Sequence, residues 1–95
     1  MASAVLLLHR KRVFDDGTIE EMKLWRVPNP VLGSDHEFKY SLFYGREGER
    51  LVCYDNEPGK GDHRHIDQRE EAYAFTTPER LLADFLEDVL RLRRH

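Results

Sequence analysis

The feature that most restricts the fold is an alternation of large and polar side chains between residues 37 and 45. The large side chains occupy every second position: Phe38, Tyr40, Leu42 and Tyr44. The residues between them are Lys39, Ser41 and Phe43. Successive side chains of a β-strand point to opposite faces, so this period predicts a strand over Glu37–Gly45 with one buried face. A strand of this kind needs partner strands and a covering layer.

Shorter patterns on both sides predict the partner strands. The runs are Ala4–Phe14, Thr18–Val27, Arg50–Tyr54, His63–Ile66 and Ala72–Phe75. Asp16-Gly17 between the first two runs is a strong hairpin signal. Pro28 and Pro30 end the second run, since proline cannot donate to a strand ladder. Because the connections are short, we predict an antiparallel meander of five to six strands.

The C-terminal part of the chain predicts one amphipathic helix. Thr77 can cap it, Pro78 suits its first turn, and Glu79 suits its positive end. Apolar residues then recur at helical spacing: Leu82, Phe85, Leu86, Val89 and Leu92. The predicted fold class is therefore α+β, with this helix packed on one face of the sheet and Phe85 in the core.

Composition limits the class of protein. With 95 residues and a net charge of −3, we expect one domain over residues 1–95 that does not coat DNA nonspecifically. Cys53 is the single cysteine, so a disulfide within one chain is excluded, and we expect Cys53 to be a small buried residue. The apolar run Ala4–Leu8 is too short for a signal-peptide core or a membrane span. We expect a reducing cytoplasm and no membrane association.

Polar groups that can do chemistry are concentrated between Tyr54 and His65. The segment holds a phenol, three acids, two fixed cations and two imidazoles, and two glycines flank Lys60. His63 and His65 share one face of a strand, with a separation of roughly 6.5–7 Å along the chain. That spacing suits a general acid and a general base on either side of one phosphodiester.

Neighbouring residues fit the same reading. Lys60 and Arg64 can offset charge on a phosphorane, and Gly59-Lys60-Gly61 can aim backbone N–H groups at a phosphate. Asp35 or His36, from the earlier loop, is expected to join the segment in a concave patch. The sequence alone does not decide which histidine is the acid.

Two other readings stay open. In the first, Asp62, His63 and His65, with His36 or Asp55, hold a metal ion for a metal-dependent phosphodiesterase. In the second, the protein acts without catalysis, by binding a target through basic and aromatic side chains. Tyr40, Tyr44 and Tyr73 would then stack on bases, although tyrosines on strands usually pack in a core.

Several stretches together resemble the TumE-type toxin family. They are Trp25-Arg26-Val27-Pro28, Gly33 to Tyr40, Tyr54 to His65, Glu70-Glu71-Ala72-Tyr73 and Leu81 to Phe85. The resemblance covers nearly the whole chain. It implies a small toxin of a toxin–antitoxin module, whose partner is an antitoxin with a helix-turn-helix domain. Ribonuclease activity is expected by analogy with other small toxins.

The predicted function is accordingly a metal-independent endoribonuclease toxin, with RNA as substrate and no cofactor or metal. The expected catalytic residues are Tyr54, Lys60, Asp62, His63, Arg64 and His65. The expected substrate-binding residues are His36, Lys39, Asp55, Asn56, Gly59 and Gly61. Whether the protein forms a homodimer is left open.

Overall fold

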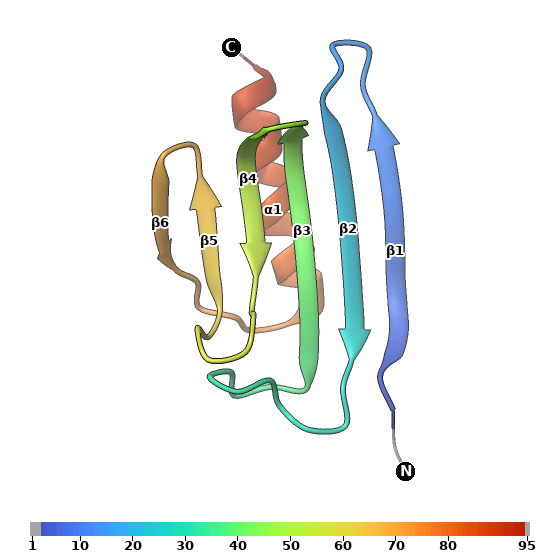
Figure 1. Cartoon of the computed structure of the whole chain (residues 1–95), viewed down its shortest axis with the longest axis vertical. Coiled ribbons are helices and arrows are strands. Elements are labelled where there is room, and N and C mark those ends of the chain that lie inside the picture. Colours follow the sequence, from blue (N-terminus) through green and yellow to red (C-terminus); the bar gives the residue numbers. More distant parts are fainter. Residues whose placement is uncertain (1–2, 95) are drawn as a thin grey trace.

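The computed structural model describes residues 3–94 and shows one antiparallel sheet with a helix against it (Figure 1). The strands follow sequence order across the sheet. They are β1 (Val5–Val13), β2 (Ile19–Arg26), β3 (Phe38–Arg46), β4 (Glu49–Asp55), β5 (His63–Ile66) and β6 (Arg69–Ala72), and the helix is α1 (Pro78–Arg93). The predicted α+β meander is confirmed.

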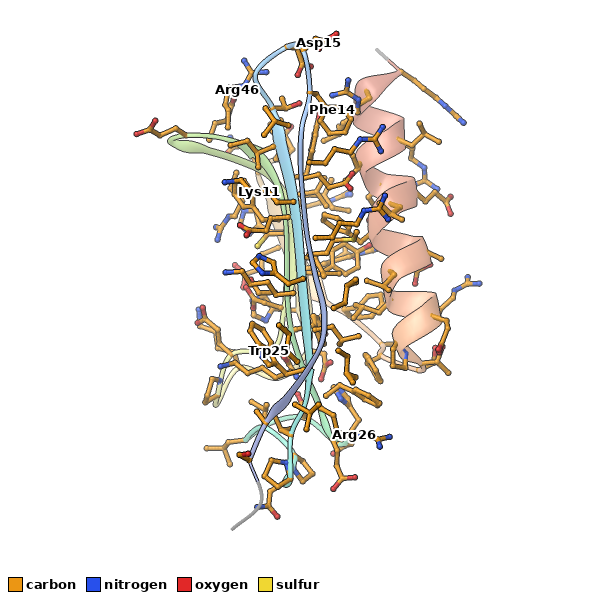
Figure 2. All side chains as sticks on the ribbon, turned by 90° about the vertical axis from the view of Figure 1, so that its right-hand side faces the viewer. Lys11, Phe14, Asp15, Trp25, Arg26 and Arg46 are labelled. Atoms are coloured by element: carbon orange, nitrogen blue, oxygen red, sulfur yellow. The ribbon has the colours of Figure 1, made fainter. Side chains whose placement is uncertain are left out.

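The helix covers one face of the sheet only. Figure 2 views the sheet edge-on, with α1 on one side and no helix on the other. Helix α1 begins where predicted, because the Thr77 side chain accepts a hydrogen bond from the Arg80 N–H at 3.1 Å. Phe85 is fully buried, so its predicted place in the core is confirmed. We call the two sides of the sheet the helix face and the open face.

The strand register assigns residues to these faces. Leu42 lies opposite Met22 on β2 and Tyr54 on β4, and all three belong to the core on the helix face. Phe43, one residue further, lies opposite Cys53 on the open face. Residues two positions apart in a strand share a face, so the assignment extends along each strand. The core on the helix face also includes Tyr40, Tyr44, Val52, Leu81, Phe85 and Val89.

The predicted last strand, Ala72–Phe75, is wrong in its position. The structure has β6 at Arg69–Ala72, joined to β5 by the two-residue turn Asp67–Gln68. Asp67 adopts φ 55°, a left-handed conformation that aspartate tolerates in tight turns. The three charged residues of β6 carry no apolar alternation, so the sequence gives no strand signal there.

Candidate functional site

A small polar hollow of about 80 Å³ lies on the open face where β4 and β5 meet the loop between them. Strand pairing places Asp55 opposite His63 and Cys53 opposite His65, so four side chains point to the same side. The hollow is lined by Arg50, Cys53, Asp55, Glu57, Lys60, His63, His65 and Glu70. The two histidines that the sequence singled out therefore do share one site.

The ring nitrogens of His63 both face oxygen atoms. Nδ1 lies 3.1 Å from the Gly61 carbonyl oxygen, which can only accept a hydrogen bond. Nε2 lies 2.8 Å from Asp55 Oδ1, an ion-pair distance, although the two atoms are not aligned as a hydrogen bond. An imidazolium ring, which carries a proton on each nitrogen, matches both neighbours.

The surroundings of His65 are of a different kind. Nε2 lies 3.5 Å from Arg50 Nη2, a nitrogen that can only donate, and Nδ1 lies 3.6 Å from Glu70 Oε2. A neutral ring with its proton on Nδ1 and a lone pair on Nε2 matches these neighbours. The two histidines of the hollow thus have unlike neighbours: two acceptors lie beside His63, and one donor and one acceptor lie beside His65.

Arg50 reaches the hollow because of a register shift. The pairing of β3 with β4 changes between Tyr44 and Gly45, so that Gly45 faces Arg50 while Tyr44 faces Val52. Strict alternation would have placed Arg50 on the helix face with Val52. The shift moves it to the open face. Sequence reasoning missed Arg50 for this reason, and it also missed Glu57 and Glu70, which line the hollow from a loop and from β6.

The thiol of Cys53 is not set up as a nucleophile. Burial, followed by the nearby Asp55 carboxylate, raises the pKa of the Cys53 thiol to about 11. The thiol is protonated near neutral pH, whereas a reactive cysteine needs a lowered pKa. Cys53 therefore serves as packing at the floor of the hollow.

Arg64 and Tyr54 lie on the opposite side of the sheet from the two histidines. Arg64 Nη1 donates to the Tyr54 hydroxyl at 3.1 Å, and Nη2 lies 3.0 Å from Glu71 Oε2. The Tyr54 hydroxyl donates to Asp88 of α1, and burial raises the pKa of this phenol above its usual range. The expectation that Arg64 stands beside the imidazoles is corrected, because a residue between two same-face positions points to the other face.

Asp62 is the centre of a second polar cluster, at the N-terminal end of β3. Its carboxylate accepts hydrogen bonds from the Ser34 hydroxyl at 2.7 Å and the Tyr40 hydroxyl at 2.6 Å. His36 Nε2 lies 2.6 Å from Asp62 Oδ2, and the His36 ring stacks on Phe75 with centroids 3.7 Å apart. The cluster ties the loop before β3 to the loop before β5.

The predicted patch of His36 with His63 and His65 is therefore wrong. His36 packs beside Tyr40, a core residue of the helix face, whereas His63 and His65 face the open side. The carboxylate of Asp62 attracts His36 to its own side of the sheet. Asp35, the alternative partner, is exposed and does not line the hollow.

Asn56 and the glycines also connect these loops. Asn56 is 1% exposed. Its Oδ1 accepts a hydrogen bond from the Tyr40 N–H, and its Nδ2 donates to the Phe38 carbonyl and the Ser34 hydroxyl. The Gly59 N–H donates to the Leu32 carbonyl at 2.7 Å. The Asn56 side chain thus makes its hydrogen bonds inside the protein, and its Oδ1 takes the place of a strand carbonyl as acceptor for the Tyr40 N–H.

The backbone around Lys60 does not form the expected phosphate cradle. The Lys60 N–H donates to the Glu57 carbonyl, and the Gly59 N–H donates to the Leu32 carbonyl. Both N–H groups are therefore occupied within the protein and do not point toward a ligand. Gly33 and Gly61 both have positive φ, and a Cβ on Gly33 would lie 2.8 Å from the Gly61 nitrogen. These glycines allow two loops to touch.

Replacing Asp62 by asparagine should destabilise the protein by about 1–3 kcal/mol, because buried donors lose a charged acceptor. Burial alone would raise the pKa of Asp62, but hydrogen bonds from Tyr40, His36 and Ser34 outweigh it and leave the pKa below its usual value. The stabilisation is then complete above about pH 4 and is lost as the pH falls through the lowered pKa. Urea unfolding from pH 7 to pH 2 should show the two proteins converging in acid. A constant difference in unfolding free energy would contradict this role.

The tyrosines considered for base stacking are core residues. Tyr40, Tyr44 and Tyr73 are 1%, 3% and 9% exposed. Their ring faces are packed, so the interpretation that they stack on bases is wrong. The open face presents Trp25 instead, with the Lys39 ammonium 5.7 Å from its ring centroid. Lys39 thus lies on the same face of the sheet as the hollow, two strands from β5.

The ligand set suggested for a metal is not assembled. Within residues 3–94, no three or more histidine, cysteine, aspartate or glutamate side chains are grouped so that they could hold an ion. Asp62 and His36 belong to the cluster at the N-terminal end of β3, and the carboxylate of Asp62 already has three partners.

The fold and the site define a small α+β protein in which a helix covers one face of a meander and an ionisable hollow occupies the other. The chain belongs to the TumE toxin family: the family described as toxin TumE matches residues 3–93. Comparisons with curated proteins and with solved structures found no match. In the part of the chain that the structure describes, no helix is long and apolar enough to cross a membrane.

Proposed function

We propose that this member of a toxin family is a metal-independent endoribonuclease and that the hollow on the open face is its active site. The observation that carries the proposal is the pair His63 and His65, which share one hollow and have unlike neighbours. His63 faces two acceptors, whereas His65 faces one donor and one acceptor. A reaction that needs one charged and one neutral imidazole fits this pair.

The proposed step is attack of a ribose 2′-hydroxyl on the adjacent phosphorus. The lone pair on His65 Nε2 takes the hydroxyl proton, and the 2′-oxygen forms a bond to phosphorus. The bond from phosphorus to the 5′-oxygen breaks, and His63 gives its Nε2 proton to that oxygen. The products are a 2′,3′-cyclic phosphate and a 5′-hydroxyl, and no water or oxidant takes part. The Asp55 carboxylate, 2.8 Å from His63 Nε2, can stabilise the charged ring before the proton is transferred.

Charge in the hollow supports a dependence on protonated histidine. Two permanent cations, Arg50 and Lys60, stand against three carboxylates, those of Asp55, Glu57 and Glu70. This set leaves one excess negative charge, which the charge on one imidazole cancels, so an anionic phosphate diester is no longer repelled once one of the two histidines is protonated. Lys60 is the proposed partner of the phosphorane, and Lys39 with Trp25 offers a cation and a ring for the neighbouring nucleotide.

Incubation of the purified protein with structured and unstructured RNA tests the proposal. We expect cleavage that continues in excess EDTA and is lost in a His63→Ala, His65→Ala double variant. His9→Ala is the matched control, since His9 is an exposed histidine on the same face that pairs with Glu21 on β2. Cleavage abolished by EDTA would contradict the proposal and favour a metal-dependent phosphodiesterase.

A toxin family implies an antitoxin partner, and we propose that this partner carries a helix-turn-helix domain and that both proteins act in the cytoplasm. The competing function is poisoning by binding alone. Toxicity of the double histidine variant in cells, without RNA cleavage, would favour that function and count against the ribonuclease.

A further inference from the structure

Strand β1 forms a long free edge of the sheet. It has nine residues, and within residues 3–94 it pairs with β2 alone, so its outer backbone groups face away from the sheet. The opposite edge, β6, has only four residues. Figure 2 looks onto the β1 edge, and no helix or described loop lies in front of it. A free edge of this length is a template for an added strand.

The two halves of β1 differ in chemistry. Val5, Leu6 and Leu7 are 55%, 52% and 50% exposed, a run of apolar side chains open to solvent. The second half contains Arg10-Lys11-Arg12, all exposed. Within residues 3–94, none of these three cations forms an ion pair, whereas the neighbouring His9 pairs with Glu21 at 2.8 Å.

We infer that the β1 edge binds an extended segment of the antitoxin as a seventh strand. This segment places apolar side chains beside Val5–Leu7 and acidic side chains beside Arg10–Arg12. Backbone hydrogen bonds supply affinity in such strand addition, and side chains supply specificity. The inference rests on membership of a toxin family and not on the ribonuclease, since β1 and the hollow are separated by β2 and β3.

Charge distinguishes this partner from a second copy of the chain. Pairing β1 with another β1 brings a second basic run, His9–Arg12, to the same edge and supplies no acid for it. Full-length antiparallel pairing about His9 would set Arg10–Arg12 opposite Leu6–Leu8 of the second copy, whereas oppositely charged side chains directly opposite each other stabilise a strand pair. An acidic segment therefore complements this edge better than the protein itself does.

The test uses the purified complex of this chain with the antitoxin encoded beside it. Hydrogen exchange followed by mass spectrometry should show strong slowing of exchange over residues 5–13 on complex formation. Calorimetric titration should show at least tenfold weaker binding for Arg10→Glu, Lys11→Glu. The matched control, Arg69→Glu, Arg91→Glu, makes the same change in net charge at exposed positions on β6 and α1 and should bind within about twofold of the natural chain.

Four results would overturn the inference. The first is protection in the complex that omits residues 5–13. The second is unchanged affinity of the Arg10→Glu, Lys11→Glu variant in a protein whose melting temperature is unaltered. The third is a free protein that sediments as a dimer with residues 5–13 already protected, which would identify a second copy as the occupant. If the Arg10→Glu, Lys11→Glu variant lost RNA cleavage but kept its affinity for the antitoxin, that result would likewise overturn the inference, because it would assign the basic edge to RNA.

Discussion

Replacing either His63 or His65 by alanine should slow RNA cleavage by about 10²–10⁴-fold, the usual contribution of a positioned proton-transfer group. The rate of the natural protein should follow a bell-shaped pH profile, because one imidazole must be neutral and the other charged. Single-turnover rates measured from pH 4 to pH 9 check both expectations. His9→Ala should keep both the rate and the profile.

The two variants should differ on an activated substrate. A uridine 3′-phosphate ester of 4-nitrophenol has a leaving group that departs without a proton. If His63 is the acid, His63→Ala should recover most of its rate on this substrate and lose the alkaline limb of the profile, whereas His65→Ala should stay slow. The reverse pattern would contradict the assignment that we derive from Asp55 and Arg50.

Truncation of Phe85 to alanine should lower the free energy of unfolding by about 3–5 kcal/mol. Its ring is fully buried and meets the Tyr54 ring edge-on at 5.7 Å between centroids. A domain of this size has a total stability of about 5–15 kcal/mol, so the variant should be close to unfolding at 37 °C.

Chemical denaturation measures this loss, with Leu90→Ala as the control on the same helix. Leu90 is 49% exposed and should cost less than about 1 kcal/mol. Equal losses at the two positions would mean that the helix does not dock through Phe85.

Most of the fold follows from local patterns in the sequence. The alternation in β3 and the cap and apolar stripe of α1 each reflect burial on one side of an element, and burial of that kind leaves a period. Strand β6 leaves none, because Arg69–Ala72 is a charged edge that pairs through its backbone. Its place depends on the turn at Asp67, which only the folded chain reveals.

The site was predicted less completely, for two physical reasons. The spacing of His63 and His65 gives their common face, and the same rule moves Arg64 to the other side. A register shift then brings Arg50 into the hollow, and such a shift has no signature in composition or spacing. The polar residues of one segment also serve two purposes, since Asn56 and Asp62 connect loops while their neighbours line the hollow.

The chemical structure of the newly formed RNA ends distinguishes attack by the 2′-hydroxyl from attack by water. A 5′-labelled and a 3′-labelled oligonucleotide are cut by the purified protein in EDTA, and the products are analysed by mass spectrometry. We expect a 2′,3′-cyclic phosphate on one fragment and a 5′-hydroxyl on the other, because the 2′-oxygen is the nucleophile. A 5′-phosphate, or the same cyclic ends formed equally fast by the His63→Ala, His65→Ala variant, would contradict the proposed mechanism.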